Sequence, residues 1–279
     1  VEAVATEAQN HATEIGRQAI DGGYDVVVAF GGDGTLNEVA NGLAGTDLPV
    51  AMLPGGSTNV VCRTLGIPND VVDATEHLLS LADDFSPRKI DLGLVEDRYF
   101  VFSCGAGIDA TVVKRVDKNP KLKSTAGPWY YSWAALSGYY RNYLRNPVKI
   151  EATVGERVET GITALAQNSD PFTYFAKQPI HVCEDIAIDD GHLAMILLQR
   201  ANQLDMLNVV PRLLTKKLSA YKHGQVIHFD EMLEAELKSV STDESGEVRP
   251  FPVQVDGDYI GEFDQVRLKA APGALTIIA

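Results

Sequence analysis

The residues best suited to chemistry follow a run of valines near the start of the chain. Gly31-Gly32-Asp33-Gly34-Thr35 comes directly after the apolar segment 26–30 and opens a predicted helix. Glycines let the backbone lie close against a ligand, and the free amides at a helix start bind phosphate. Bare phosphate repels a carboxylate. Asp33 is therefore predicted to act through a bound Mg²⁺ or to accept the proton of a hydroxyl group. The plainer alternative is a strand-to-helix turn in which Asp33 is only a cap.

A second turn of small residues follows the next predicted strand. The strand spans residues 49–54, and Gly55-Gly56-Ser57-Thr58-Asn59 comes after it. Ser57 and Thr58 supply hydroxyl donors, while Asn59 can hold either the turn or a ligand. The alternative is a plain series of helix caps, because Ser, Thr and Asn all cap helices well. Together the two turns favour binding of a nucleotide with several phosphates.

The elements that must position these turns alternate between strand and helix. Helices are predicted over 2–21, 35–43, 60–64 and 71–81, and strands over 26–30 and 49–54. Glycine turns at strand ends indicate an α/β sheet with its ligand outside those ends. A doubly wound fold normally has a strand before the first helix, so we expect an N-terminal piece to precede this sequence.

After a proline-marked linker the pattern becomes β-rich. Short alternating segments predict an antiparallel sandwich or barrel, with helices at 128–144 and 203–217. The strands are predicted at 90–95, 99–104, 148–154, 162–167, 193–198, 225–229, 234–239, 251–255 and 265–269. We therefore predict an α/β nucleotide-binding domain over 1–88 and a β-rich domain over 89–279, whose last segment packs back on the first domain.

Composition narrows the class of protein. The 279 residues are 45% hydrophobic and 22% charged, as in a soluble globular protein, with no membrane-length apolar run and no signal peptide. The three cysteines fit no metal or disulfide pattern, which favours the cytoplasm. A net charge of −14 argues against nucleic-acid binding and limits membrane contact to local patches.

Taken in order, the motifs resemble the catalytic domain of the diacylglycerol kinase and sphingosine kinase superfamily, and most of all its soluble bacterial lipid kinases. The two glycine turns resemble its nucleotide motifs. Three later segments resemble its remaining signatures: Gly105-Ala106-Gly107-Ile108-Asp109-Ala110, Asp189-Asp190-Gly191-His192-Leu193 and Val255-Asp256-Gly257-Asp258. The resemblance implies a two-domain fold with ATP and Mg²⁺ between the halves. It also implies phosphorylation of a lipid hydroxyl during transient contact with the inner face of a membrane.

The resemblance also assigns roles to individual residues. The ATP contacts it implies are Thr6, Gly31, Gly32, Asp33, Gly34, Thr35, Leu36, Asn37, Glu38, Ser57 and Asn59. Asp258 stands where the family has its acidic proton acceptor, with Asp33 as the second catalytic acid. A structural Mg²⁺ or Ca²⁺ maps to Asp190 and the main-chain carbonyls of Ala187 and His192. Gly105, Gly107 and Asp109 are the implied substrate contacts.

The chain also departs from the family pattern. Asp258 is one methylene shorter than the usual glutamate, and Val60 stands where an aspartate is common. Cys183-Glu184 replaces a proline before the metal loop. The family's first strand, with its Asn-Pro turn, is missing. Asp256-Gly257-Asp258 is alternatively an ordinary hairpin turn, because Asp-Gly is a strong hairpin signal.

Two surfaces suggest how a lipid approaches. Aromatic residues crowd the helix predicted at 128–144, which suits a membrane interface or an acyl pocket, or else ordinary core packing. Two basic runs serve either as headgroup contacts or as solvated faces. The first is Lys114, Arg115, Lys118, Lys121 and Lys123, and the second is Arg212, Lys216, Lys217 and Lys222. The rival functions are an NAD kinase and a nucleotide- or lipid-binding protein without turnover. Neither the lipid nor the oligomeric state, a homodimer included, is specified by the sequence.

Overall fold

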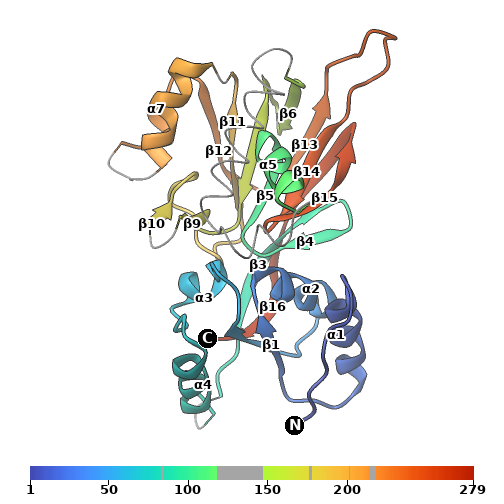
Figure 1. The fold of residues 1–279 in the computed structure, drawn as a ribbon, viewed down its shortest axis with the longest axis vertical. Coiled ribbons are helices and arrows are strands. Elements are labelled where there is room, and N and C mark those ends of the chain that lie inside the picture. Colours follow the sequence, from blue (N-terminus) through green and yellow to red (C-terminus); the bar gives the residue numbers. More distant parts are fainter. Residues whose placement is uncertain (83–84, 118–146, 176–177, 201, 214–217) are drawn as a thin grey trace.

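The computed structural model describes residues 1–82, 85–117, 147–175, 178–200, 202–213 and 218–279 (Figure 1). A mixed α/β half occupies the lower part of Figure 1, and an antiparallel β-sandwich half lies above it. The predicted fold class is therefore confirmed.

The lower half is built from two parallel strands and four helices. They are β1 (Val27–Gly31), β2 (Val50–Pro54), α1 (His11–Asp21), α2 (Asp33–Leu43), α3 (Val60–Leu65) and α4 (Val71–Ser80). The first helix was predicted from residue 2, which is wrong, because α1 begins only at His11. Asn10 is left-handed, with φ 65°, and the Glu38 carboxylate accepts the N–H groups of Asn10 and Ala12. These contacts fix the start of the helix.

Two long strands join the halves. They are β3 (Arg88–Val95) and β16 (Gln265–Ile278), which pair antiparallel with each other. The strand predicted at 265–269 in fact has 14 residues. Its first part pairs with a strand of the sandwich, and its last residues, Ile277 and Ile278, run parallel to β2. The domain division at residue 88 stays a prediction.

The upper half contains two facing sheets. One has the order β12-β11-β8-β5-β14-β15, and the other continues from β16 through β13 and β6 to β7, with β3 and β4 beside β16. The bounds are β4 (Arg98–Phe100), β5 (Ser103–Gly107), β6 (Ile150–Val154), β7 (Arg157–Gly161), β8 (Thr163–Gln167), β11 (Leu193–Leu198), β12 (Val226–Met232), β13 (Glu234–Ser239), β14 (Phe251–Val255) and β15 (Asp258–Phe263). The segment predicted as one strand at 99–104 divides into β4 and β5.

Smaller elements complete the half. Two short strands, β9 (Thr173–Phe175) and β10 (Gln178–Ile180), pair antiparallel with each other. The helices of this half that are described are α5 (Ile108–Asp117), α7 (Gln203–Leu213) and the 3₁₀ helix η2 (Ala220–Lys222). The helix predicted at 203–217 is described as far as Leu213. The aromatic helix predicted at 128–144 lies outside the described residues. Within the described part of the chain, no helix is long and apolar enough to cross a bilayer.

Each half has its own core. Leu36, Leu43 and Ile277 are fully buried in the lower half, where α2 packs on the sheet. Phe100 and Phe251 are fully buried between the two sheets of the sandwich. Because apolar burial stabilises each half separately, the polar residues at the junction are free to shape a cavity there.

Candidate active site

Two glycine turns lie against each other at the carboxyl ends of β1 and β2. The N–H of Gly55 donates to the carbonyl of Gly31 at 2.7 Å. A Cβ added to Gly56 would lie 2.7 Å from the Cα of Gly32. No side chain fits that gap, so glycine is required for the turns to form one continuous backbone surface.

Asp33 points from the first turn to the start of α3. Its Oδ2 accepts the N–H of Val60 at 3.0 Å, and its Oδ1 accepts that of Val61 at 3.2 Å. Burial raises the pKa of Asp33, while these two amides lower it. Asp33 therefore does act as a cap, but for α3 rather than for its own helix. Asp33 also lines the cavity described below, so the same side chain caps α3 and belongs to the candidate site.

Asn59 holds the second turn. Its Oδ1 accepts the N–H of Gly56 at 3.0 Å, and its Nδ2 donates to the Gly56 carbonyl at 3.0 Å and to Asn69 at 2.8 Å. Of its two expected roles, the structure shows the one that stabilises the turn. The neighbouring Ser57 and Thr58 line the cavity instead.

The residues expected to bind ATP along α2 face different ways. Gly32, Gly34 and Thr35 line the cavity, but Leu36 is buried in the core of the lower half. Helical rotation of about 100° per residue turns successive side chains away from the glycine surface. Asn37 accordingly faces the sandwich and Glu38 caps α1.

Two other expected ATP contacts do not line the cavity. Gly31 lies against Thr35, whose Oγ1 is 2.4 Å from the position a Cβ on Gly31 would take. Thr6 belongs to the exposed segment before α1. The first turn therefore offers backbone and Thr35 to a ligand, and Thr6 is not among the residues that line the cavity.

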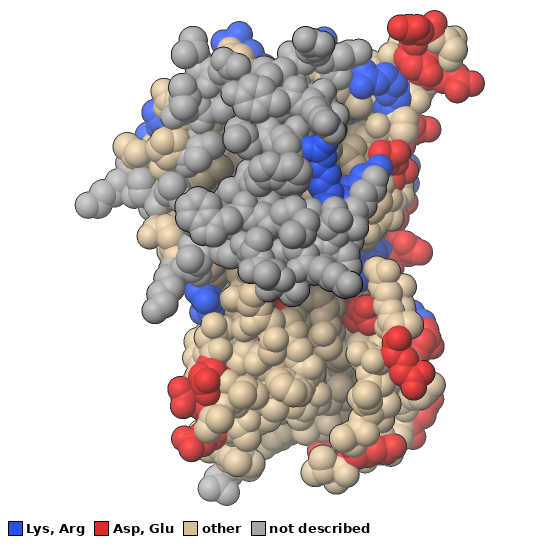
Figure 2. Space-filling view, in the orientation of Figure 1, with Lys and Arg blue, Asp and Glu red and all other residues tan. Residues whose placement is uncertain are grey.

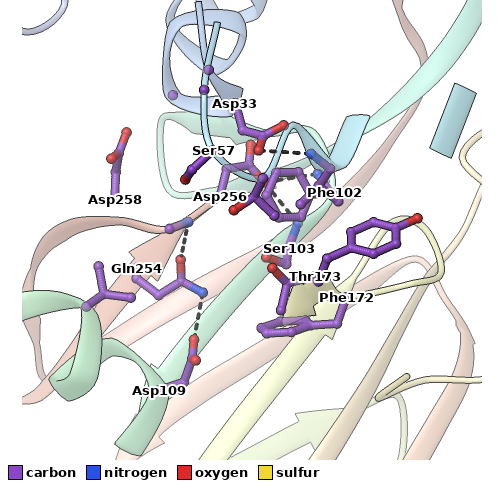
Figure 3. A pocket seen from close by; sticks show the side chains of 18 of the residues that line it. Asp33, Ser57, Phe102, Ser103, Asp109, Phe172, Thr173, Gln254, Asp256 and Asp258 are labelled. Atoms are coloured by element: carbon purple, nitrogen blue, oxygen red, sulfur yellow. Dashed lines mark hydrogen bonds between the residues drawn. The ribbon is translucent and has the colours of Figure 1, made fainter. Parts of the chain in front are cut away.

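Asp258 is brought to the first glycine turn by a tight hairpin. Asp256 and Gly257 have φ values of 48° and 85°, and they join β14 to β15 with Val255 paired to Asp258. The Oδ2 of Asp258 lies 3.2 Å from the position a Cβ on Gly34 would take. The segment is thus a hairpin turn, as the alternative stated, and the hairpin also delivers Asp258 to the site (Figure 3).

Asp256 is the most heavily bonded carboxylate of the hairpin. Its oxygens accept the N–H groups of residues 101, 102 and 103 at 2.6, 3.0 and 3.0 Å and the Nδ2 of Asn37 at 2.8 Å. Burial raises the pKa of Asp256 to about 6, although these donors lower it. Asp256 thereby ties α2 in the lower half to the hairpin in the upper half. The sequence placed Asp256 in a family motif or a hairpin turn but gave it no role of its own.

A cavity of about 540 Å³ is lined by the glycine turns of the lower half and by residues of the upper half, Asp256 and Asp258 included. One wall is formed by the glycine turns, with Ser57 and Thr58. Apolar side chains that follow β4 in the chain also line the cavity, namely Phe102, Val112, Val113, Phe172, Tyr174 and Ile180, with the polar residues Ser103, Asp109, Thr173 and Gln254 among them. The cavity therefore pairs a surface rich in hydrogen-bond donors with an apolar one.

One of the three expected substrate contacts reaches this cavity. Asp109 lines it, and burial raises the pKa of Asp109 to about 6. Gln254 donates to Oδ2 of Asp109 at 2.7 Å, which lowers that pKa in part. Gly105 lies behind this contact. Gly107 has φ 91°, and a Cβ there would meet the carbonyl of Ile162 at 2.4 Å, so it serves packing.

The assigned metal loop lies away from the cavity. The Asp190 carboxylate accepts the N–H of Ala187 at 2.8 Å and that of His192 at 3.0 Å. Ala187 and His192 are also the residues whose carbonyls were predicted to bind the structural metal ion. Their amides hold the loop around the Asp190 carboxylate, and binding of the ion itself stays a prediction. Buried Asp91 of β3, which sequence reasoning missed, accepts the N–H of Gly191 at 2.6 Å and anchors the loop to the sheet.

The basic runs are only partly described. Lys114 pairs with Glu262 at 2.8 Å, and Arg212 donates to the carbonyl of Leu218 at 2.6 Å. On the face shown in Figure 2, acidic side chains lie on both halves, and the net charge of the chain is −14. The remaining lysines of the first run, at 118, 121 and 123, and those at 216 and 217, lie outside the described residues.

Comparisons with protein families and with known proteins agree on one family for this chain. Residues 1–95 match the diacylglycerol kinase catalytic domain, and residues 103–279 match the YegS C-terminal NAD kinase beta sandwich-like domain. Diacylglycerol kinase of Staphylococcus haemolyticus (strain JCSC1435) is 29% identical over 93% of this chain and 73% of its own length. Diacylglycerol kinase of Staphylococcus aureus (strain Newman) is 30% identical over 93% of this chain and 76% of its own length.

The fold has a solved counterpart as well. A putative diacylglycerol kinase from Bacillus anthracis str. Sterne superposes with a TM-score of 0.72 over 98% of this chain and 82% of that one, at 21% identity. At that identity the likeness concerns the fold alone. Since two family models match successive parts of the chain and a relative is 30% identical over 93% of it, this chain belongs to the diacylglycerol kinase family of kinases.

Proposed function

We propose that this chain transfers the γ-phosphate of ATP, with Mg²⁺, to a hydroxyl of diacylglycerol or a related lipid alcohol. The observation that carries the proposal is the cavity, which has a glycine-rich polar wall, apolar side chains and the Asp258 carboxylate beside Gly34. A phosphate donor and a lipid acceptor need both kinds of surface in one place.

The polar wall suits the phosphates of ATP. Backbone amides of the glycine turns and the hydroxyls of Ser57 and Thr58 supply donors without positive side chains. Glycine at 34 and 56 keeps this surface open, since a Cβ at either position would approach other groups of the site. Such positioning accounts for most of the rate in phosphoryl transfer.

The carboxylate of Asp33 suits Mg²⁺ held together with ATP. Among the described residues, no three His, Cys, Asp or Glu side chains gather closely enough to hold an ion. Mg²⁺ usually takes one or two carboxylates and completes its ligands with substrate phosphates and water. Asp33 provides one such carboxylate at the cavity, which leaves Asp258 to accept the hydroxyl proton. When bound, the ion would neutralise charge that develops on the transferred phosphoryl group.

The lipid side follows from the apolar side chains of the cavity. In the proposed complex the lipid hydroxyl lies between Asp258, which accepts its proton, and Asp109, which orients it. Phe172 and Tyr174 pack against the apolar part of the lipid. Because such lipids reside in bilayers, the protein makes transient contact with a membrane surface. The smaller reach of Asp258 is offset by its place directly beside the first glycine turn.

The proposal is tested with labelled ATP and vesicles containing diacylglycerol, with NAD assayed in parallel and products separated by thin-layer chromatography. We expect label in the lipid and a fall in kcat of about 100-fold or more for Asp258→Asn, because general bases contribute at least that much. Asp97→Asn, at an exposed position before β4, is the matched control and should keep full activity.

Asp33→Asn separates capping from chemistry. The amide keeps one acceptor for the α3 amides, so a pure cap loses about 1 kcal/mol of stability and little activity. A role at Mg²⁺ predicts a large fall in kcat instead. Label on NAD alone, or unchanged ATP consumption with lipid in both aspartate variants, contradicts the proposed function. Lipid extraction and mass spectrometry after co-expression identifies the acceptor.

A further inference from the structure

Gln254 is a buried polar residue in an otherwise apolar strand. β14 reads Phe251-Pro252-Val253-Gln254-Val255, and Gln254 is 2% exposed while its side chain borders the cavity. A buried amide without partners is costly, so a glutamine in this strand requires bonds at both ends. Its two bonds connect two elements of the sandwich half that each carry an acid of the proposed active site, α5 with Asp109 and the hairpin with Asp258.

The two bonds fix the orientation of the amide. Oε1 accepts the N–H of Gly257 at 2.8 Å, and Nε2 donates to Oδ2 of Asp109 at 2.7 Å (Figure 3). An N–H group only donates, so the oxygen of Gln254 must face Gly257. The NH₂ group must then face Asp109, which meets it as an acceptor.

Gly105 leaves the space for this bridge. It is the residue paired with Gln254 between β5 and β14. A Cβ on Gly105 would lie 2.1 Å from Oδ2 of Asp109 and 2.8 Å from Nε2 of Gln254. Any side chain at 105 would therefore break the bridge. This contact gives the glycine, which does not line the cavity itself, a role in the site.

We propose that Gln254 is a positioning residue that ties Asp109 of α5 to the hairpin that carries Asp258. The bridge sets the separation of the two carboxylates and keeps Oδ2 of Asp109 an acceptor. This inference rests on the proposed function, since its role is to hold the two acids on either side of the substrate hydroxyl.

Exchange of the amide for a carboxyl tests the bridge. In Gln254→Glu at acid pH, the protonated carboxyl donates to Asp109 and accepts from Gly257, as glutamine does. At alkaline pH two carboxylates face each other and repel, so the bridge opens. Gln254→Leu cannot form either hydrogen bond, so the bridge is absent at every pH. We therefore expect a pH-dependent defect in the first variant and a constant one in the second.

Other titrating groups surround the bridge. They are Asp256 and Asp258 of the hairpin, Cys104 of β5, and Lys114 of α5 with its partner Glu262 of β15. Burial raises the pKa of Cys104 far above the assay range. All of these groups are identical in the wild type and the variants. The ratio of variant to wild-type activity at each pH therefore isolates the exchange at Gln254.

Gln167 provides the matched control. It is also a fully buried strand glutamine, but its Nε2 donates to the Ser169 carbonyl and its Oε1 accepts the N–H of Cys183, so it touches backbone only. Gln167→Glu tests the cost of a buried carboxyl away from the cavity. It should change stability without a pH-dependent change in kcat per folded molecule.

The measurement is lipid phosphorylation from pH 5.5 to 8.5, with kcat and KM for ATP determined separately. For Gln254→Glu we expect kcat near the wild-type value at the acid end and a fall of about 100-fold at the alkaline end, the size that a misplacement of about 1 Å can cause. KM for ATP should stay unchanged. A constant ratio to wild type at all pH values, or the same profile in Gln167→Glu, overturns the inference.

A second readout does not depend on the substrate. Urea unfolding of Gln254→Glu should show stability that falls with rising pH relative to wild type, partly from burial of the new carboxyl and partly from its repulsion by Asp109. Asp109→Asn in the same chain removes the repulsion and should make the fall clearly smaller, by more than Asp109→Asn changes the pH dependence of the wild type. If wild type phosphorylates no lipid while this coupling is present, the proposed function fails and the bridge stands. If the lipid is phosphorylated but the coupling is absent, the bridge fails alone.

Discussion

Asp109→Asn is expected to flatten the pH dependence of folding stability. Asparagine has nearly the same volume as aspartate and keeps an oxygen that accepts from Gln254, so the exchange removes the titrating charge and little else. Burial raises the pKa of Asp109 from its ordinary 3.8 to about 6, which means that the folded state holds its proton more tightly than the unfolded chain. Stability from this group is therefore present at acid pH and lost as the pH rises through 6.

The magnitude follows from the two pKa values. At pH 5 the folded carboxyl is mostly protonated and the unfolded one mostly ionised, whereas at pH 8 both are ionised. Linkage gives a loss of about 1.4 kcal/mol for wild type between these two pH values, and none for asparagine. The free energy of unfolding of Asp109→Asn should therefore rise by about 1.4 kcal/mol relative to wild type from pH 5 to pH 8.

Urea unfolding at 0.5-unit pH steps measures this difference, using the midpoint with a common slope. Asp256 has a similarly raised pKa, but it is present in both proteins and cancels in the comparison. Asp97→Asn, at an exposed site, is the control and should give a curve parallel to wild type. A parallel curve for Asp109→Asn as well would refute the reasoning, because Asp109 would then titrate alike in the folded and unfolded states.

Two further substitutions test the architecture of the site. Gly56→Ala should lower the free energy of unfolding by about 1–3 kcal/mol and raise KM for ATP, because its Cβ would lie 2.7 Å from Gly32 Cα and 2.8 Å from Asn59 Oδ1. Urea unfolding and initial rates measure the two effects. Unchanged values would show that the turns are not tightly packed. Asn37→Ala should lower the free energy of unfolding by about 1–3 kcal/mol and also lower kcat, because it leaves Asp256 with one donor fewer and removes the bond between α2 and the hairpin. Calorimetry measures the stability and steady-state kinetics the rate. A loss of stability without a loss of kcat would show that the bond serves the fold alone.

Local patterns predicted the elements that carry local signals. The run of valines, the glycines after it and the apolar spacing of α2 all lie within a few residues of one another, so strand, turn and helix were predicted where they occur. The helix start at His11 was wrong, because it depends on Glu38 from another helix. The continuation of β16 to Ile278 likewise depends on pairing with β2, far away in the sequence.

The same distinction applies to the site. The two turns and Asp258 were found because each has a short signature. Asn37 and Asp256 are 219 positions apart, and nothing in either segment indicates that they are bonded. Gln254 carried one usable signal, a polar residue in an apolar strand, which demands buried partners but does not name them. Side-chain roles that depend on tertiary neighbours therefore stayed beyond the sequence.

The segment Asp256-Gly257-Asp258 is an ordinary hairpin turn and also places an acidic residue of the proposed active site. Left-handed backbone at Asp256 and Gly257 makes the turn tight, and four donors on the Asp256 carboxylate hold it to both halves. The reach of Asp258 is then set by the backbone rather than by the length of its side chain. Because Gly34 has no Cβ, the shorter acid already lies against the glycine turn.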